Sequence, residues 1–252
     1  MRRRRNIPAE QVHLPYDTLY HGTSSLSAVV SVLESGFLLP PSISGMLSRE
    51  EGELAPMRGF VYMTPNWTEA ARYAMEDLGT DLGLAFVFQV DPYELVTIEP
   101  DEDDLGQAIY IAHDGHYWLD GEWPELFAKT LEAEPGLRWT LRDVAQRILT
   151  PEQLGLLGTI ADGNQLGVED YAPMAKRMFY DVPQSLRIDV LEHGANVAHR
   201  GAVPVYSVLV CEGSWYGIYK SGPSSCKRID TIDDLYAYLS LAESEALEKH
   251  RE

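Results

Sequence analysis

Two short stretches decide the predicted fold: Tyr20-His21-Gly22-Thr23 and, forty residues later, Val61-Tyr62-Met63-Thr64. The first predicts a strand that enters a loop, and the second predicts a strand within an apolar run. A second aromatic residue, Tyr73, follows Tyr62 by eleven residues on a helix-like segment. Gly22 has no Cβ, so an amide group of a ligand can approach its backbone closely. The order and spacing favour a site in which an imidazole and two tyrosines line a flat ligand.

Each of these elements also has an ordinary structural explanation. His-Gly-Thr is a common tripeptide at the end of a strand. Tyr62 lies in the apolar run of residues 60–63 and could be a core residue. Tyr73 could serve packing alone. The combination, and no single motif, indicates a ligand site.

Two helices and a loop are predicted between and after the two stretches. The first helix spans residues 27–35, because its apolar residues share one face (Val29, Val32 and Leu33) and Gly36 provides a stop. The loop of residues 38–58 is rich in Pro, Ser and Gly and carries acidic residues. It either covers a bound ligand or only connects the two strands.

The second helix carries Tyr73. Asn66 is expected to cap it, and Glu69 to complete a capping box. The residues predicted to share a face with Tyr73 are Ala70, Ala74 and Asp77. The small Ala70 leaves room for a flat ring. Residues 84–91 then form a nearly continuous apolar run, which predicts a buried strand.

This succession resembles the amino-terminal half of the ADP-ribosyltransferase superfamily, on the side of the poly(ADP-ribose) polymerases and the diphtheria-toxin type. The likeness covers about residues 18–98 and returns more faintly near residues 186–210. It implies an α+β fold of the split β-sandwich kind. It also implies NAD as co-substrate and transfer of ADP-ribose with release of nicotinamide, which is a glycosyltransferase reaction.

The resemblance assigns roles to matching residues. It implies that His21 holds a hydroxyl of the nicotinamide ribose and that the Gly22 backbone bonds the carboxamide. Tyr62 would line the nicotinamide ribose and ring, and Tyr73 would stack on the ring, where an aromatic face attracts a cationic pyridinium. Two polar residues are expected beside them: Thr23 and Thr64.

The third motif of the family departs from the pattern in this chain. The family commonly has a Glu a few residues before an Ile-Pro or Val-Pro. Counting back from Val203-Pro204, the position falls on Asn196, and the nearest acid is Glu192. An Asn can bond a ribose hydroxyl but places no negative charge beside a developing oxocarbenium. Three alternatives follow: Glu192 acts through a different loop, the site is neutral, or catalysis is weak or lost.

The remaining chain predicts an insertion and a terminal helix. Residues 99–183 begin with an acidic linker and continue as a mostly helical insertion that serves substrate recognition or only extends the structure. The predicted divisions are residues 1–17 (N-terminal extension), 18–98 and 184–230 (the two halves of the core), 99–183 (insertion) and 231–252 (C-terminal helix).

Local patterns within these divisions give further predictions. Asp114-Gly115 predicts a β-hairpin over residues 109–119. His113 and His116 lack a third ligand at suitable spacing, so no metal is predicted there. Thr140 is expected to cap a helix of residues 141–149. Alternation in residues 186–192 predicts a strand. Thr231 and Asp234 are expected to cap the last helix.

Composition bounds the class of protein. The 252 residues, with a net charge of −19, predict a soluble globular protein without a membrane partner. Such a charge disfavours non-specific nucleic-acid binding and suits a basic partner. The two cysteines give neither a disulfide framework nor a zinc signature, so a reducing, cytoplasmic setting is predicted, with a single bridge left open. The basic start, residues 1–6, is either a disordered tip or an electrostatic arm.

Four functions are compatible with these patterns. The first is an NAD-dependent mono-ADP-ribosyltransferase acting on a macromolecular acceptor, protein or nucleic acid, as a bacterial or phage toxin with a cognate antitoxin or inhibitor. The second is a catalytically degenerate module that binds NAD, ADP-ribose or a partner macromolecule. The third is an RNA 2′-phosphotransferase, for which the chain offers His199 and Arg200 near the third motif. Together with Arg187, these two residues could also form a local basic patch for nucleic acid. The fourth is a structural protein without a ligand.

Overall fold

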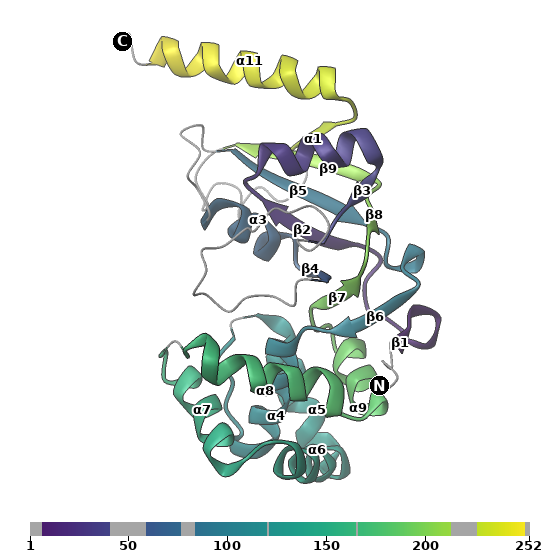
Figure 1. Ribbon diagram of the computed structural model, residues 1–252, viewed down its shortest axis with the longest axis vertical. Coiled ribbons are helices and arrows are strands. Elements are labelled where there is room, and N and C mark those ends of the chain that lie inside the picture. Colours follow the sequence, from purple (N-terminus) through teal and green to yellow (C-terminus); the bar gives the residue numbers. More distant parts are fainter. Residues whose placement is uncertain are drawn as a thin grey trace. The chain divides into compact units, whose positions relative to one another are not determined.

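The computed structural model describes residues 7–40, 59–76, 84–119, 121–164, 166–212 and 226–249 (Figure 1). The chain forms two compact units that each draw on three separate segments. The first unit comprises Met1–Tyr16, Pro40–Tyr62 and Val96–Gly201, and the second comprises Asp17–Leu39, Met63–Leu95 and Ala202–Glu252. Both units combine helices with antiparallel strands. The predicted α+β class is therefore confirmed.

The second unit is built on a four-stranded sheet in the order β10-β9-β5-β2. Its strands are β2 (Leu19–Thr23), β5 (Leu84–Val90), β9 (Ser207–Glu212) and β10 (Lys227–Ile229), and all their pairings are antiparallel. The apolar run of residues 84–90 becomes a buried strand inside the sheet, as predicted, because both of its edges and most of its side chains are covered. A small sheet pairs β3 (Phe37–Leu38) with β8 (Val203–Pro204).

The helices described beside these sheets are α1 (Leu26–Ser35), α3 (Trp67–Glu76) and α11 (Ile232–Lys249). α1 ends as predicted at Gly36, whose φ of 75° is a left-handed conformation that suits glycine. Thr231 and Asp234 cap α11 reciprocally, since the Asp234 N–H donates to Thr231 Oγ1 and the Thr231 N–H donates to Asp234 Oδ2. A short 3-10 turn, η2 (Pro92–Glu94), follows β5.

The start of α3 differs from the predicted capping box. Asn66 Oδ1 accepts the Thr68 N–H at 3.0 Å, so Asn66 caps the helix. The Glu69 carboxylate, however, accepts the hydroxyl of Thr64 at 2.8 Å, and the Asn66 N–H donates to that same hydroxyl at 3.1 Å. Thr64 therefore stands between the two residues that were expected to bond each other. Asp77, predicted to share a face with Tyr73, lies outside the described residues.

The first unit contains a second four-stranded sheet, in the order β1-β6-β7-β4. Its strands are β1 (Ile7–Pro8), β6 (Thr97–Pro100), β7 (Val197–Arg200) and β4 (Phe60–Met63), and a 3-10 turn, η1 (Ala9–Gln11), follows β1. The division between the units falls inside β4, because Tyr62 belongs to the first unit and Met63 to the second.

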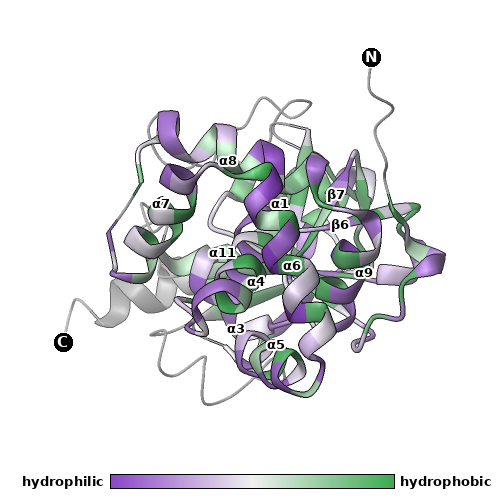
Figure 2. Cartoon of the chain, turned by 90° about the horizontal axis from the view of Figure 1, so that it is seen from below, coloured by the Kyte–Doolittle hydropathy of each residue, from purple (hydrophilic) through white to green (hydrophobic). Residues whose placement is uncertain are grey.

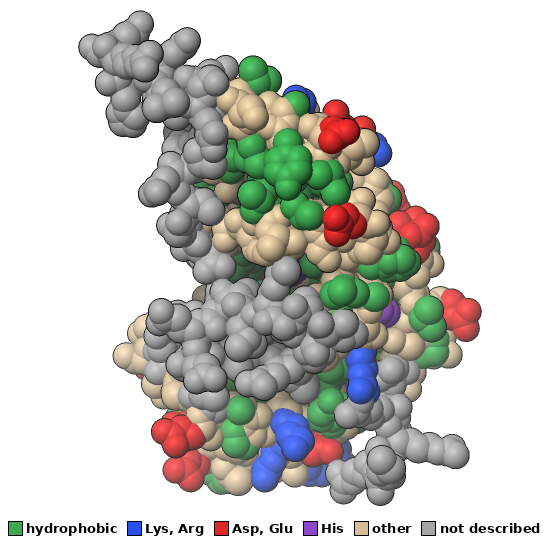
Figure 3. Space-filling view, turned by 45° about the horizontal axis from the view of Figure 1, so that its top comes forward, with side chains coloured by type: hydrophobic (Ala, Val, Ile, Leu, Met, Phe, Trp, Pro, Cys, Tyr) green, Lys and Arg blue, Asp and Glu red, His purple; other side chains and the backbone are tan. Residues whose placement is uncertain are grey.

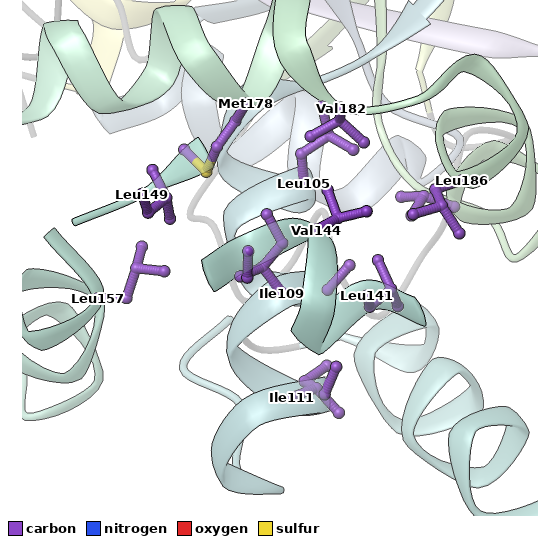
Figure 4. Close-up of a cluster of buried hydrophobic side chains, with 14 of the residues drawn as sticks. Leu105, Ile109, Ile111, Leu141, Val144, Leu149, Leu157, Met178, Val182 and Leu186 are labelled. Atoms are coloured by element: carbon purple, nitrogen blue, oxygen red, sulfur yellow. The ribbon is translucent and has the colours of Figure 1, made fainter. Parts of the chain in front are cut away.

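Most of the first unit is a helical group around one central helix. α4 (Glu102–Asp114) contacts each of its other members: α5 (Glu122–Ala133), α6 (Pro135–Ile148), α7 (Pro151–Ala161), α8 (Val168–Asp181) and α9 (Gln184–Glu192). Leu105 and Ile109 of α4 lie in the middle of the buried cluster in Figure 4. These helices each carry hydrophilic and hydrophobic residues (Figure 2), as expected where one face packs on a core.

Three local predictions for this part of the chain were wrong. Residues 109–114 continue α4 instead of forming a hairpin, and Gly115 ends the helix at φ 86°. The Asp-Gly pair was read as a hairpin turn, but glycine in this conformation also terminates helices. Residues 184–192 form α9 instead of a strand. Thr140 is no cap and lies inside α6, where its hydroxyl donates to the Gly136 carbonyl at 2.9 Å.

Cys211 and Cys226 form a disulfide in the second unit. Cys211 is 1% exposed on β9 and packs with Trp67, Ala70 and Ala71 of α3. The bridge that the sequence left open is thus present, and it joins β9 to the residues directly before β10.

Candidate functional site

The His21-Gly22-Thr23 stretch lies on β2, at one end of the second unit's larger sheet. One edge of β2 pairs with β5. On the other edge, the Tyr20 N–H donates to the Thr64 carbonyl at 2.8 Å, and the Thr64 N–H donates to the Tyr20 carbonyl at 2.9 Å. Backbone groups of a strand alternate between its two edges. The N–H and C=O of Gly22 therefore point to the same edge as those of Tyr20, where the described residues place no further strand.

Gly22 also has a packing reason to be glycine. A Cβ at this position would lie 1.7 Å from the carbonyl oxygen of Ala70 and 3.1 Å from the backbone nitrogen of Ala74. The backbone of α3 thus rests directly on β2. The sequence suggested that Gly22 leaves room for a ligand, but on this face of the sheet the room is taken by the helix. Only the strand edge remains as the place where a ligand amide can meet the Gly22 backbone.

Tyr73 lies on α3 between the two alanines that meet Gly22. Its side chain is 42% exposed, so a ring surface is accessible. The Arg72 guanidinium carbon lies 5.4 Å from the centre of the Tyr73 ring, a cation–π distance. A cation thus already lies beside the Tyr73 ring, so a flat ligand would have to use the exposed remainder of the ring.

His21 lies on the opposite face of the sheet from α3, because side chains alternate along a strand. Its imidazole stacks on the ring of Phe88, with centroids 6.1 Å apart and planes inclined by 5°. The two expected polar neighbours have local partners. Thr23 Oγ1 accepts the Ser25 N–H at 3.1 Å, and the buried Thr64 hydroxyl belongs to the start of α3. Both threonines serve local structure.

Tyr62 belongs to the first unit and is paired there with a residue that the sequence did not single out. Its hydroxyl lies 2.9 Å and 3.0 Å from the two carboxylate oxygens of Glu102, and it donates to them. Glu102 begins α4 and is 6% exposed. Burial, followed by the negative charge of Asp103, raises the pKa of the Glu102 carboxyl to about 7. In the sequence Glu102 looked like part of a solvated acidic linker.

The third-motif candidates hold the helical group in place. Glu192 lies at the end of α9, and its carboxylate accepts the His13 N–H at 3.0 Å. Asn196 uses its backbone: its carbonyl accepts the Asp101 N–H at 2.9 Å, and its N–H donates to the Asp104 carboxylate. Asn196 thus anchors the first turn of α4.

Arg187, His199 and Arg200 do not form the basic patch that the sequence suggested for nucleic acid. Arg187 is 2% exposed and makes an ion pair with the buried Glu99. His199 is 7% exposed, and its Nδ1 lies 2.6 Å from the Thr97 carbonyl oxygen. Only Arg200 is exposed. Two of the three residues are therefore committed to the interior of the first unit and do not present a surface to phosphate.

The histidine cluster after α4 has a local arrangement. His116 Nδ1 lies 2.8 Å from Asp114 Oδ2, and both side chains are well exposed. Among the residues that the structure describes, no three His, Cys, Asp or Glu side chains are grouped closely enough to hold a metal ion.

On the face shown in Figure 3, acidic side chains lie at several separate places. The net charge of −19 is thus not gathered at one point of that face.

Comparison of the chain with family profiles, with curated proteins and with solved structures gave no match. A functional assignment therefore depends on the residues themselves. Within the described ranges, no helix combines the length and the apolar character that a membrane span requires.

Proposed function

We propose that this chain is an NAD-dependent ADP-ribosyltransferase that transfers a single ADP-ribose to a macromolecular acceptor and releases nicotinamide. The observation that carries the proposal is the edge of β2 at Gly22. Its N–H and C=O point away from β5, on the edge that Tyr20 uses to bond Thr64. A primary carboxamide carries an acceptor oxygen and, on the same side, one of its two N–H donors, so it can bond both the N–H and the C=O of Gly22.

The residues around this edge suit the rest of a nicotinamide nucleotide. Tyr73, on the helix that packs on Gly22, offers an accessible ring for stacking on a pyridinium. The resemblance to ADP-ribosyltransferases gives His21 and Tyr62 the ribose. Nicotinamide leaves NAD as a neutral molecule from a cationic bond, so a site that clamps the ring and positions an acceptor accelerates transfer.

The same resemblance supports the remaining parts of the proposal. The specific fold would be the split β-sandwich of the ADP-ribosyltransferases. The acceptor is a protein or a nucleic acid, and a toxin role would bring a cognate antitoxin or inhibitor. The predicted cytoplasmic setting belongs to this proposal as well.

The test is release of nicotinamide from NAD by the purified protein, with cell lysate supplied as acceptor. We expect release by the native chain and at least about a tenfold loss in His21→Ala and Tyr73→Ala, since each removes one contact to the nicotinamide half. Tyr93→Ala is the matched control, because Tyr93 is a 67% exposed tyrosine of the same unit outside the site. Equal release by all four proteins would refute the site.

A second function, a degenerate module that binds NAD or ADP-ribose without turnover, is favoured by the placement of the third motif. Glu192 is engaged with the His13 backbone, and Asn196 anchors α4, so neither supplies the usual acid. Binding of NAD without release of nicotinamide would support this function. A gain of turnover in Asn196→Glu would show that the missing carboxylate is the cause, whereas loss of a native activity in Glu192→Gln would make Glu192 the acid.

A further inference from the structure

The outer face of α6 carries an exposed tryptophan between two arginines. The inner face of the helix, with Leu141, Val144 and Ala145, packs into the buried core of the helical group. Trp139 lies on the outer side and is 66% exposed, although tryptophan is on average a largely buried residue. A single exposed aromatic residue needs no explanation, so the inference depends on what surrounds it.

The two arginines beside Trp139 each have a defined contact. The guanidinium carbon of Arg142 lies 5.3 Å from the centre of the Trp139 ring, which is a cation–π distance. Arg138 Nε donates to the carbonyl of Ala112, in the last turn of α4, at 3.1 Å. Both arginine side chains are half-buried. The guanidinium groups are therefore positioned before a partner binds, which lowers the entropic cost of binding.

Arg138 and Arg142 form no ion pair with a carboxylate in the described part of the chain. The sequence has 39 acidic and 20 basic residues, so carboxylates are abundant, and Arg147 of the same helix does pair with Asp143. Like charges four residues apart in a helix also repel each other. Carboxylates from another molecule would pair both charges and offset this repulsion.

We propose that Arg138, Trp139 and Arg142 form a docking surface for an acidic segment of a partner protein. Two carboxylates of the segment pair with the arginines, and an apolar side chain between them packs on the exposed part of the indole. A guanidinium offers two parallel N–H groups to a carboxylate, and tryptophan and arginine are enriched among the residues that dominate protein interfaces. This surface lies within the first unit, so it does not depend on the proposed NAD site.

The charges nearby favour an acidic protein segment over a nucleic acid and over a second copy of the chain. Asp143 on α6 and Glu134 directly before it are exposed. A nucleic acid carries a phosphate at every nucleotide and would meet these carboxylates too, whereas a peptide can place its carboxylates opposite the arginines alone. Two copies of the chain, each with a net charge of −19, repel each other.

The experiment titrates the full chain with a synthetic peptide that has two glutamates four residues apart and leucine between them. The indole N–H signal of Trp139 is followed by ¹⁵N NMR and is identified by its absence in Trp139→Phe, and calorimetry gives the Kd. The same peptide with glutamine in place of glutamate, and oligothymidylate, are titrated in parallel. Arg200→Gln is the matched control for Arg142→Gln, because Arg200 is an exposed arginine of the same unit on β7.

We expect the glutamate peptide to shift the Trp139 signal and to bind with a Kd below about 1 mM, and the glutamine peptide to bind at least about tenfold more weakly. Trp139→Ala should weaken binding of the glutamate peptide by at least about tenfold, and Arg142→Gln by about three- to tenfold, since the surface concentrates its energy in these residues. Arg200→Gln should change the Kd by less than about twofold.

Four outcomes would overturn the proposal. The Trp139 signal could fail to shift with the glutamate peptide, or Arg200→Gln could weaken binding as much as Arg142→Gln, which would show a response to net charge alone. Binding of oligothymidylate without binding of the peptide would assign the surface to nucleic acid. Dimers of the native chain in sedimentation that Trp139→Ala abolishes would assign it to a second copy.

Discussion

The helical group of the first unit and the sheet of the second unit are held together by different kinds of contact. Around α4, apolar side chains from six helices fill a common core. At β2, a glycine lets the backbone of α3 come against the strand itself. A side-chain core depends on total volume and tolerates exchange of similar residues, whereas a backbone contact admits no added atom. The part of the second unit that carries the His21-Gly22-Thr23 stretch is therefore the less tolerant one.

The largest effect is expected from Gly22→Ala. The new Cβ would lie 1.7 Å from the Ala70 carbonyl oxygen, and a backbone atom cannot move aside as a side chain can. We expect a loss of more than about 5 kcal/mol, beyond ordinary overpacking, and loss of stable structure in β2 and α3. Hydrogen exchange with mass spectrometry measures this for each unit. Gly59→Ala is the control, because no atom lies within 4 Å of its added Cβ. If the amides of α3 in Gly22→Ala exchange as slowly as in the native chain, the backbone contact at Gly22 is not the limiting one that we describe.

Phe127→Ala tests the other side of the comparison. Phe127 is fully buried in the helical group and contacts the rings of Trp123 and His193. The cavity should destabilise the first unit by about 3–5 kcal/mol, with normal protection retained in β2 and β5. Trp139→Ala, a 66% exposed aromatic residue on α6, should change stability by less than about 0.5 kcal/mol. If both variants behave alike, the helical group does not depend on its buried core.

The pH dependence of the free energy of unfolding should show a smaller effect, which comes from Glu102 in the first unit. Glu102 has a pKa of about 7 in the folded chain against 4.5 for the free group, so the folded state holds this proton more tightly. Folding is therefore favoured below pH 4.5, and this contribution is lost as the pH rises to about 7. At most about 3 kcal/mol is involved.

Urea unfolding of the native chain and of Glu102→Gln at pH 5 and pH 8 measures this contribution. The native chain should lose more stability than the variant on going to the higher pH. A variant with the same slope would show that Glu102 titrates normally.

The smallest effect is expected from Gly155→Ala in α7. This glycine is exposed in the helix, and an added Cβ meets no atom within 4 Å. Alanine should stabilise the first unit by about 0.5–1 kcal/mol, because glycine loses more conformational freedom in a helix. Thermal unfolding would detect it. A glycine-to-alanine substitution should therefore stabilise the first unit at position 155 and disrupt the second unit at position 22. A loss of stability in Gly155→Ala would contradict this difference between the units.

The sequence predicted those elements whose signals are local. The buried strand of residues 84–90, the stop at Gly36 and the Thr231–Asp234 cap all follow from neighbouring residues. Two predictions failed where a local signal has two meanings. Asp114-Gly115 can end a helix as well as turn a hairpin, and residues 186–192, whose alternation predicted a strand, lie in the short helix α9.

The candidate site was predictable only in part for the same reason. His21, Gly22, Tyr62 and Tyr73 could be proposed from spacing. The partners that define their chemistry come from distant segments: Ala70 against Gly22, and Glu102 against Tyr62. Nothing in the run of acids at residues 101–104 distinguishes the one carboxylate that meets a tyrosine forty residues away. Such pairs depend on tertiary structure, which a local pattern does not contain.

The redox state of Cys211 and Cys226 reports on the compartment in which this protein works. Cytosolic glutathione keeps most thiols reduced, whereas disulfides persist in oxidising compartments. Cys211 is almost inaccessible against α3, whereas Cys226 is partly exposed, so a reductant can attack the bridge from the Cys226 side. Alkylation of free thiols in rapidly quenched cells would show whether Cys211 and Cys226 are present there as a disulfide or as two thiols. Because Cys211 packs with α3, the helix that carries Tyr73 rests on one end of this bridge.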